Sequence, residues 1–270
     1  MLVTGLFLAT GVLYTVACAL YLAFMARGSE NIGRWAGRSL IGAAVFHVAF
    51  LGADWAIAGN PPIGDIHRTL SLASLLSIVA YLAAGTRLRI AVLGGFITPV
   101  ALLFLFGSAL GRSVNHVPYE VRSVLLPVHI SVNVLGVVAF TLAFAAALAY
   151  LIQEGLLRRK KLGGLFQRLP ALDVLDSLGF RLVTIGFPLL TLGIITGALW
   201  AVRLDPTAPV FTTTQGFAIL AWLVFAGVLL LRVAAGWRGR RAAIGTMVGY
   251  AFATAVLVGY MVNSTGAAAG

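Results

Sequence analysis

The stretch VLLPVHISVNVLGVVAFTLAFAAALAYLIQ, residues 124–153, decides the fold class of this chain. Its 30 residues include no Asp, Glu, Lys or Arg. About 20 apolar residues in a helix are enough to cross the hydrocarbon core of a bilayer. Lipid permits only helices or closed barrels, and the stretch lacks the alternation of apolar and polar residues that a barrel strand shows. It therefore predicts a transmembrane helix.

Comparable apolar stretches recur along the whole chain. The chain is 60% hydrophobic and only 10% charged, whereas a typical soluble domain is about 25% charged. We therefore expect an all-α polytopic integral membrane protein, a bundle of about eight transmembrane helices forming a single membrane domain over residues 1–270. Besides the first stretch, the expected spans are 2–26, 39–59, 69–85, 90–111, 180–202, 212–234 and 243–263; the span 69–85 is short, and residues 60–68 can extend it.

The basic residues orient this bundle. Of the 19 Lys and Arg, 15 fall in the connections after the first, third, fifth and seventh spans, while the eight acidic residues divide evenly. Basic residues favour the cytoplasmic side. This predicts a multi-pass protein of a bacterial inner membrane with both termini on the outer, periplasmic side. No Lys or Arg precedes the first span, which is therefore expected to be retained rather than cleaved as a signal peptide.

The longest cytoplasmic connection, residues 154–179, combines basic and apolar residues. Leucines recur every three residues in its second half, with two aspartates between them, which predicts a short amphipathic helix at the membrane interface. The connection is either a solvated basic anchor or a surface for lipid or a partner protein. Basic residues spread over four short loops do not form a nucleic-acid surface, so no nucleic-acid partner is expected. The leucines are Leu169, Leu172, Leu175 and Leu178, and the aspartates are Asp173 and Asp176.

Few polar side chains lie inside the spans, and each is a candidate for function. His47 lies in the middle of the second span, and His129 lies two turns inside the outer end of the fifth. Imidazole ligates haem iron, zinc and copper, and histidines without carboxylate clusters favour haem. The alternative for each is a histidine paired with a hydroxyl or a carbonyl. His67 and His116 fall in outer connections, where we expect ordinary surface residues.

Other sites are not indicated. The chain contains no phosphate-binding G-x-x-x-x-G-K-[ST], no H-E-x-x-H and no G-x-S-x-G motif, and it has a single cysteine, Cys18. We therefore do not expect an enzyme. Two pairs of glycines at i, i+4 spacing, Gly193/Gly197 and Gly245/Gly249, allow close helix contact and are expected to serve packing within the chain.

Several motifs follow one another in a specific order. They are PVHISVNVLG (127–136), AYLIQ (149–153), LLRRKK (156–161), LPALDVLDSL (169–178), IGFPLLTLG (185–193) and GALWA (197–201). This order resembles the cytochrome c assembly family of haem-handling membrane proteins, of the CcsA, ResC and CcmC types, and is most similar to its HemX-like branch. Weaker likenesses are GNPP (59–62) before LSLASL (70–75), and GWRGRRA (236–242). The resembling core spans about residues 40–263.

The resemblance implies haem as cofactor, with His129 as the best-matching ligand and His47 as the second candidate. The family's tryptophan-rich segment, W-G-x-x-W-x-W-D-P, is reduced here to Trp200 and Asp205-Pro206, which are implied as further haem-binding positions. Two histidines that the family carries near the last helices are absent from this chain.

Three functions follow as hypotheses. The first is a membrane protein of cytochrome c biogenesis that binds or passes haem beside other assembly subunits. The second is a HemX-like accessory or regulatory protein that binds no haem and contacts a haem-biosynthesis enzyme through residues 154–179. The third, a small-molecule transporter, is disfavoured because internal repeats and broken helices around an ionisable site are lacking.

Overall fold

The computed structural model describes residues 1–59, 63, 66–88, 90–110, 125–204 and 212–266, and every regular element within them is helical. The elements are α1 (Leu2–Arg27), α2 (Glu30–Ala58), α3 (Ile66–Gly85), the 3₁₀ helix η1 (Ala91–Leu93), α4 (Gly94–Gly107), α5 (Leu125–Arg158), α6 (Leu165–Arg168), α7 (Leu172–Leu204), α8 (Thr213–Ala234) and α9 (Arg240–Gly266).

The structure confirms a polytopic all-α bundle. Seven of the described helices are long and apolar enough to cross a membrane. The remaining expected span, 90–111, corresponds to η1 and α4 together, Ala91–Gly107, which is apolar but shorter. At about 1.5 Å per residue this segment falls short of a hydrocarbon core of about 30 Å. Pro99 lies inside α4 and Pro188 inside α7.

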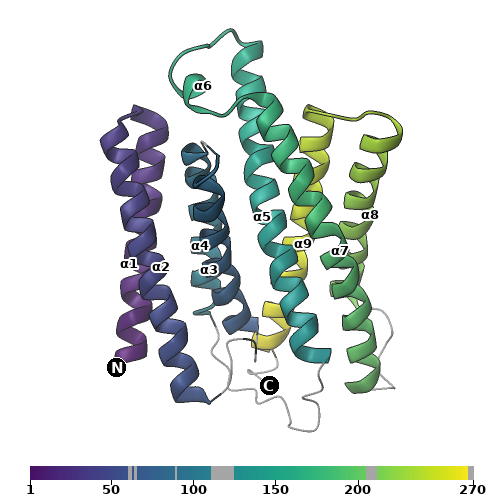
Figure 1. Cartoon of the computed structure of the whole chain (residues 1–270). Helices are drawn as coiled ribbons and strands as arrows, with labels where there is room; N and C mark the ends of the chain where they lie inside the picture. Colours follow the sequence, from purple (N-terminus) through teal and green to yellow (C-terminus); the bar gives the residue numbers. More distant parts are fainter. Residues whose placement is uncertain (60–62, 64–65, 89, 111–124, 205–211, 267–270) are drawn as a thin grey trace.

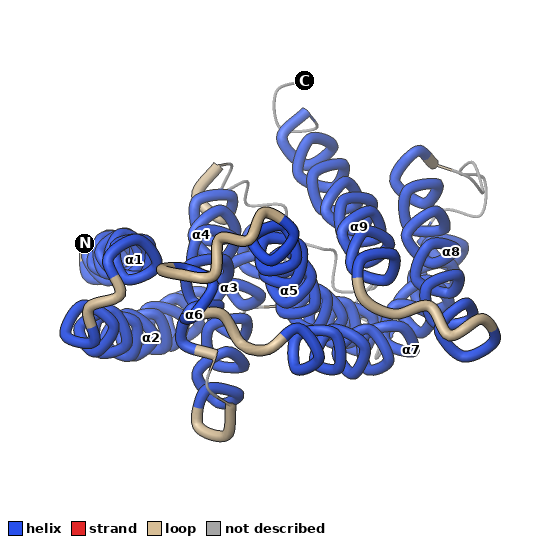
Figure 2. Tube along the Cα trace, turned by 90° about the horizontal axis from the view of Figure 1, so that it is seen from above, coloured by secondary structure: helices blue, strands red, loops and turns tan. Residues whose placement is uncertain are grey.

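Helix α5 forms the centre of the bundle. It packs against α3 and α4 on one side and against α7 and α9 on the other, and it is the most deeply buried of the candidate spans. The α1–α2 pair lies at one edge, and α8 lies at the other (Figures 1 and 2). The alanine-rich second half of α5 explains its position, because Ala143, Ala145, Ala146 and Ala149 are fully buried and let neighbouring helices approach closely.

The second pair of glycines serves packing inside the chain, as the sequence predicts. A Cβ atom built at Gly249 would lie 2.8 Å from the ring of Phe225 on α8, and one at Gly245 would lie 2.5 Å from Cγ2 of Val228. The Phe225 ring in turn stacks on Phe140 of α5, with the ring centroids 4.0 Å apart. These glycines therefore bring α9 against α8.

The prediction of a separate interfacial helix within residues 154–179 is wrong. Helix α5 continues to Arg158, a single short helix α6 follows, and α7 already begins at Leu172. Of these leucines, Leu169 lies just before α7, and Leu172, Leu175 and Leu178 lie in its first turns. Leu169 and Leu175 are 6% and 1% exposed and belong to the main core.

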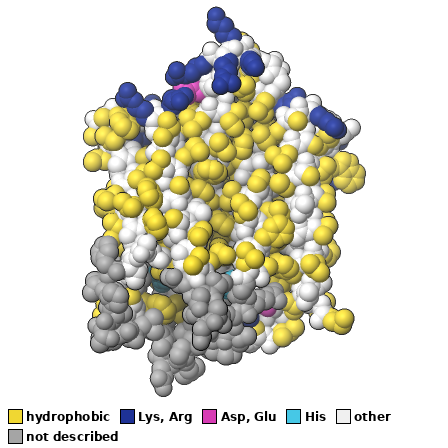
Figure 3. Space-filling model, turned by 180° about the vertical axis from the view of Figure 1, so that it is seen from behind, with side chains coloured by type: hydrophobic (Ala, Val, Ile, Leu, Met, Phe, Trp, Pro, Cys, Tyr) yellow, Lys and Arg dark blue, Asp and Glu magenta, His cyan; other side chains and the backbone are white. Residues whose placement is uncertain are grey.

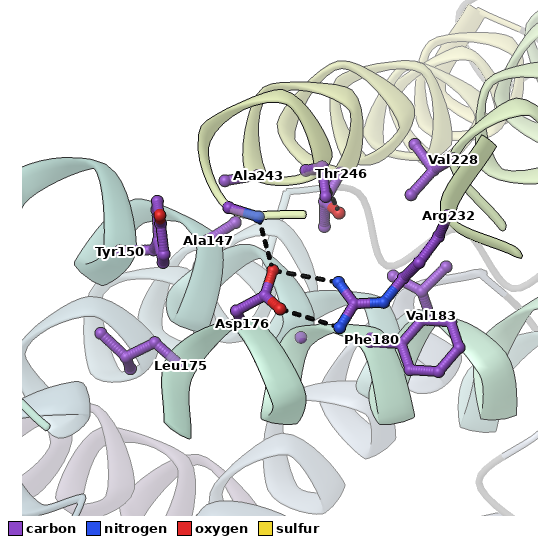
Figure 4. A pocket seen from close by; sticks show the side chains of 13 residues that line it. Ala147, Tyr150, Leu175, Asp176, Phe180, Val183, Val228, Arg232, Ala243 and Thr246 are labelled. Atoms are coloured by element: carbon purple, nitrogen blue, oxygen red, sulfur yellow. Dashed lines mark hydrogen bonds and ion pairs between the residues drawn. The ribbon is translucent and has the colours of Figure 1, made fainter. Parts of the chain in front are cut away.

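An aspartate in this region is tethered to the neighbouring helix α8 and to the connection before α9. Asp176 accepts two hydrogen bonds from the guanidinium of Arg232, at 3.0 and 2.8 Å, and one from the backbone N–H of Gly239 at 2.8 Å (Figure 4). The guanidinium carbon of Arg232 also lies 4.3 Å from the ring centre of Phe180. The start of α7 is therefore joined to α8 and to the connection before α9.

The two ends of the bundle differ in chemistry. Lys and Arg side chains gather at the end that carries α6 and the α8–α9 connection, which we call the basic end (Figure 3). The opposite end, where α3 and α5 begin and α7 finishes, carries His67, His129 and Trp200, and we call it the histidine end. The N-terminus and the end of α9 both lie at the histidine end (Figure 1). Which end faces the cytoplasm stays a prediction from the charge distribution.

Candidate functional site

His47 is fully enclosed between α1, α2 and α3, about halfway along α2. Its side chain is 0% exposed. The Nδ1 atom lies 3.1 Å from the hydroxyl of Tyr14 on α1, and the Nε2 atom lies 2.9 Å from Oγ of Ser71 on α3. Both ring nitrogens are therefore engaged, and the imidazole joins three helices. This arrangement corresponds to the alternative that the sequence left open, a histidine paired with hydroxyl groups.

The surroundings of His47 are closed and apolar. Phe50, one turn further along α2, packs with its ring centroid 6.0 Å from that of the imidazole. Ala17, Leu40 and Ala43 are fully buried in the same core. Asp54, two turns further along α2, is paired with Arg68 at 3.0 Å, with both side chains partly exposed. The carboxylate therefore belongs to the α2–α3 junction and not to the His47 group.

His129 lies near the start of α5, half-buried against α7. Its Nδ1 atom lies 3.1 Å from Oγ1 of Thr196. The single hydroxyl proton of Thr196 is directed to the carbonyl of Leu192, at 2.6 Å. With its own proton donated, the Thr196 oxygen accepts from the ring, which favours the tautomer with the proton on Nδ1 and the lone pair on Nε2. This is the tautomer that ligates metals through Nε2, with the other nitrogen held by a hydrogen bond.

Asn133, one turn further along α5, contacts the same imidazole. Its Nδ2 amide donates to the carbonyl oxygen of His129 at 2.7 Å, and it also lies 3.2 Å from Nδ1 and 3.4 Å from Nε2. The contact to Nε2 is long and lies at the upper edge of hydrogen-bonding distance. Asn133 thus holds the first turns of α5 in shape and touches the ring without enclosing it.

The first glycine pair makes room for these two polar side chains. A Cβ atom at Gly193 would lie 2.5 Å from Oδ1 of Asn133, and one at Gly197 would lie 2.8 Å from Cε1 of His129. The pair therefore packs within the chain, as the sequence predicts. Its role is more specific than helix packing, because it forms a flat surface on α7 against which the imidazole rests.

Trp200 lies one turn beyond Thr196 on the same face of α7. Its indole Nε1 is buried and has no hydrogen-bond partner among the residues that the structure describes. A buried N–H without a partner is costly, by about 1–3 kcal/mol, and indicates a place for an acceptor. Asp205 lies outside the described residues, as does His116, so the reduced Trp–Asp pattern stays a prediction at its second position.

His67 is not the surface residue that the sequence analysis expected. It lies in the first turn of α3 and is 4% exposed. The span was expected to begin at residue 69, whereas the helix begins at Ile66, so the ring packs beside the end of α4. A signal was present in the sequence, because positions i+3, i+4 and i+7 from His67 are also on the buried face. These are Leu70, Ser71 and Ser74.

The structure brings His67 and His129 to one end and leaves His47 apart. Helices α3 and α5 pack together around a small apolar cluster that includes Leu70 and Val134. Ile66 and Ile130, the chain neighbours of the two histidines, both pack against this cluster. His47 contacts only α1 and α3 through its ring nitrogens, in the middle of the bundle.

The family model for "Cytochrome C assembly protein" matches residues 63–268, which include α3 and every later element. The chain belongs to the cytochrome c assembly protein family. The match begins close to His67, extends through His129 and Trp200, and leaves α1 and α2 with His47 outside it. It confirms the family expected from the motif order.

Several curated members of this family are similar over most of the chain. The cytochrome c biogenesis protein CcsA of Gloeothece citriformis is 29% identical over 252 residues, which cover 75% of this chain and 76% of that protein. CcsA of Microcystis aeruginosa is 28% identical over 251 residues, with coverage of 75% and 76%. A shorter match, 42% identical over 85 residues, covers 32% of this chain and 24% of CcsA from Synechococcus sp. (strain JA-2-3B'a(2-13)).

A solved structure supports the fold of this cytochrome c assembly protein. The chain named "Cytochrome c Heme Lyase CcmF" superposes with a TM-score of 0.66 and 15% sequence identity, over 97% of this chain and 51% of that one. At this identity the likeness shows the fold and not the activity. The HemX-like branch within the family stays a prediction.

Proposed function

We propose that this chain is an inner-membrane protein of cytochrome c biogenesis that holds haem at its histidine end, with His129 as an axial ligand. The family and the names of the CcsA relatives support the first part. The geometry around His129 supports the second. Haem iron takes imidazole nitrogen as an axial ligand, and the bound group would supply its own redox chemistry.

The observation that carries the proposal is the contact between His129 Nδ1 and the Thr196 hydroxyl, which favours the tautomer with a lone pair on Nε2. Thr196 accepts from Nδ1 at 3.1 Å because its own proton is donated to Leu192. The Nε2 lone pair meets only the long contact from Asn133, at 3.4 Å, which a ligated iron would replace. The His129 side chain is only partly buried.

Trp200 fits a second feature of haem. Its buried indole N–H, one turn from Thr196, has no acceptor in the described part of the chain. A carboxylate is an acceptor only, and haem carries two on one edge of its ring. We propose that Trp200 donates to one of them; Asp205, which the family pattern pairs with it, lies outside the described residues.

His47 is assigned a different role in this proposal. Both of its nitrogens are occupied by hydroxyl groups in a closed pocket, so it joins α1, α2 and α3 and is not the second ligand. The proposed site therefore lies wholly within the part of the chain that the family model matches.

Haem absorbance tests this proposal directly. The full chain is purified in mild detergent, titrated with haemin and compared with His129→Ala. The matched control is Thr184→Ala, an exposed position on α7 whose hydroxyl bonds only its own helix. We expect a Soret band in the wild type and in the control. The affinity for haem in His129→Ala should fall at least about tenfold, the lower end of what losing support for a metal ligand costs. A wild type that gives no Soret band after haemin addition would refute the proposal.

A further inference from the structure

Thr196 lies where α7 meets the imidazole of His129. Its side chain is 9% exposed, and its Oγ1 atom lies 3.1 Å from Nδ1 of the ring. On the same helix, Gly193 and Gly197 leave the space that Asn133 and the imidazole occupy, because a Cβ atom at either position would collide with them. Helix α7 therefore presents a buried hydroxyl oxygen to the proposed haem ligand.

The hydroxyl proton of Thr196 is directed to its own helix. Oγ1 lies 2.6 Å from the carbonyl oxygen of Leu192 and 3.2 Å from that of Gly193. A carbonyl oxygen only accepts, so the proton must lie between the two oxygens at the shorter contact, where two facing lone pairs would repel each other. A hydroxyl has one proton and two lone pairs. Thr196 therefore meets the imidazole with a lone pair, as an acceptor.

The amide of Asn133 does not compete for this position. Its Nδ2 atom donates to the carbonyl oxygen of His129 at 2.7 Å, and it lies 3.2 Å from Nδ1 and 3.4 Å from Nε2. A ring nitrogen directs its proton or lone pair outward in the plane of the ring. Because the amide nitrogen is almost equally far from both ring nitrogens, it lies over the face of the ring and is aligned with neither lone pair. Of the two contacts to Nδ1, the one from Thr196 is then the one that places the proton.

The place of this proton decides whether the ring is ready to bind iron. The hydrogen bond made by one ring nitrogen sets which of the two carries the proton. With the proton on Nδ1, the Nε2 lone pair is free to ligate. Without an acceptor at Nδ1, an imidazole prefers to carry its proton on Nε2, where it blocks ligation. Partners that orient a ligating histidine in this way contribute about 10–100-fold to metal affinity.

The other histidine at this end has a different setting. Nδ1 of His67 lies 3.4 Å from the carbonyl oxygen of Gly107, the last residue of α4, and its Nε2 atom is buried without a partner in the described residues. The His67 ring lies against α4, whereas the His129 ring lies against α7. His67 is therefore not part of the arrangement that Thr196 makes with His129.

We propose that Thr196 is a positioning residue for the haem ligand. Its hydroxyl oxygen holds the proton of His129 on Nδ1 before haem arrives, so that Nε2 meets the iron as a lone pair. Thr196 acts through His129 and supplies no bond to the iron. This inference rests on the proposed function, because it names the residue that prepares the ligand of the same site.

The tautomer of His129 tests the inference without haem. The full chain is labelled with ¹⁵N-histidine and purified in mild detergent, and a two-bond ¹⁵N–¹H correlation spectrum separates protonated from unprotonated ring nitrogens by their ¹⁵N shifts. The His129 signals are assigned by their loss in His129→Ala. Thr196→Val keeps the shape of the side chain without its hydroxyl, and Thr196→Ser keeps the hydroxyl. The matched control is Thr184→Val, an exposed position on α7 whose hydroxyl donates to the carbonyl of Phe180.

We expect the proton on Nδ1 in the wild type, in Thr196→Ser and in Thr184→Val, and on Nε2 in Thr196→Val. In haemin titrations of the same proteins, the affinity of Thr196→Val should fall at least about tenfold. Thr196→Ser and Thr184→Val should bind haem as the wild type does, because both retain the acceptor at Nδ1.

Three results would overturn the inference. The first is a proton on Nε2 in the wild type, which needs no variant to detect. The second is a proton that stays on Nδ1 in Thr196→Val, since the backbone of Gly193, which also interacts with the imidazole, would then place it. The third is an unchanged haem affinity in a Thr196→Val protein whose proton has moved. A wild type that takes up no haem refutes the proposed function instead, and the ¹⁵N spectra still show whether Thr196 places the proton.

Discussion

The middle of the bundle and its histidine end treat the same side chain in opposite ways. At His47 two hydroxyl groups, from Tyr14 and Ser71, engage both ring nitrogens in a closed apolar pocket. At His129 the contact to Nε2 is a long one from Asn133, at 3.4 Å, and at His67 the Nε2 atom has no partner in the described residues. The contacts at Nε2 therefore distinguish the histidine that joins helices through both nitrogens from the histidines at the histidine end, and depth in the membrane does not.

The largest expected effect concerns the first kind of histidine. His47→Ala leaves the hydroxyl groups of Tyr14 and Ser71 buried without their partner and opens a cavity. We expect a loss of about 2–4 kcal/mol in the free energy of unfolding, measured in detergent by thermal or denaturant unfolding. Haem affinity of the folded fraction should stay within about twofold of the wild type. A stable variant would show that the buried triad does not hold α1, α2 and α3 together.

The surface beneath His129 gives the next largest effect. In Gly197→Ala the added Cβ would lie 2.8 Å from Cε1 of the imidazole, so the ring must move. We expect haem affinity to fall about tenfold, as measured by haemin titration. Gly179→Ala is the matched control, because Gly179 lies on the same helix and a Cβ atom there meets nothing within 4 Å. Equal affinities in the two variants would contradict the position assigned to the ring.

The smallest effect is expected at Trp200. Trp200→Phe keeps most of the aromatic surface and removes the unpaired N–H. One hydrogen bond contributes about 0.5–1.5 kcal/mol net, so haem affinity should fall about two- to tenfold, and the apoprotein should be no less stable. If the variant binds haem as tightly as the wild type, the indole does not donate to the ligand.

Much of the fold follows from the sequence, because lipid restricts the choice to helices and apolar stretches mark them. The charge-free run from 124 to 153 is indeed the central helix. The start of α7 was harder, since Leu175 packs into the core while Asp176 beside it is tethered to Arg232 and Gly239. Asp176 lies 56 positions from Arg232 and 63 positions from Gly239 in the chain, and periodicity within one segment does not reveal such contacts.

The candidate site was likewise only partly predictable from the sequence. His129 was predicted from the sequence, and its neighbours on α7 at Gly193 and Gly197 were noted there for packing alone. His67 was misplaced because the expected span began three residues too late, so its buried face was read as a loop. The tautomer of each histidine depends on Thr196 and Gly107, which lie 67 and 40 positions away in the chain. Such partners become visible only once the helices are packed.

The most direct test of the central claim is a haemin titration of His129→Ala beside His47→Ala, followed by Soret absorbance on folded, monodisperse protein. The contrast between the two regions predicts that His129→Ala loses at least about tenfold in affinity, while the folded fraction of His47→Ala binds as the wild type does. The reverse result, with binding lost at His47 and retained at His129, would contradict the account.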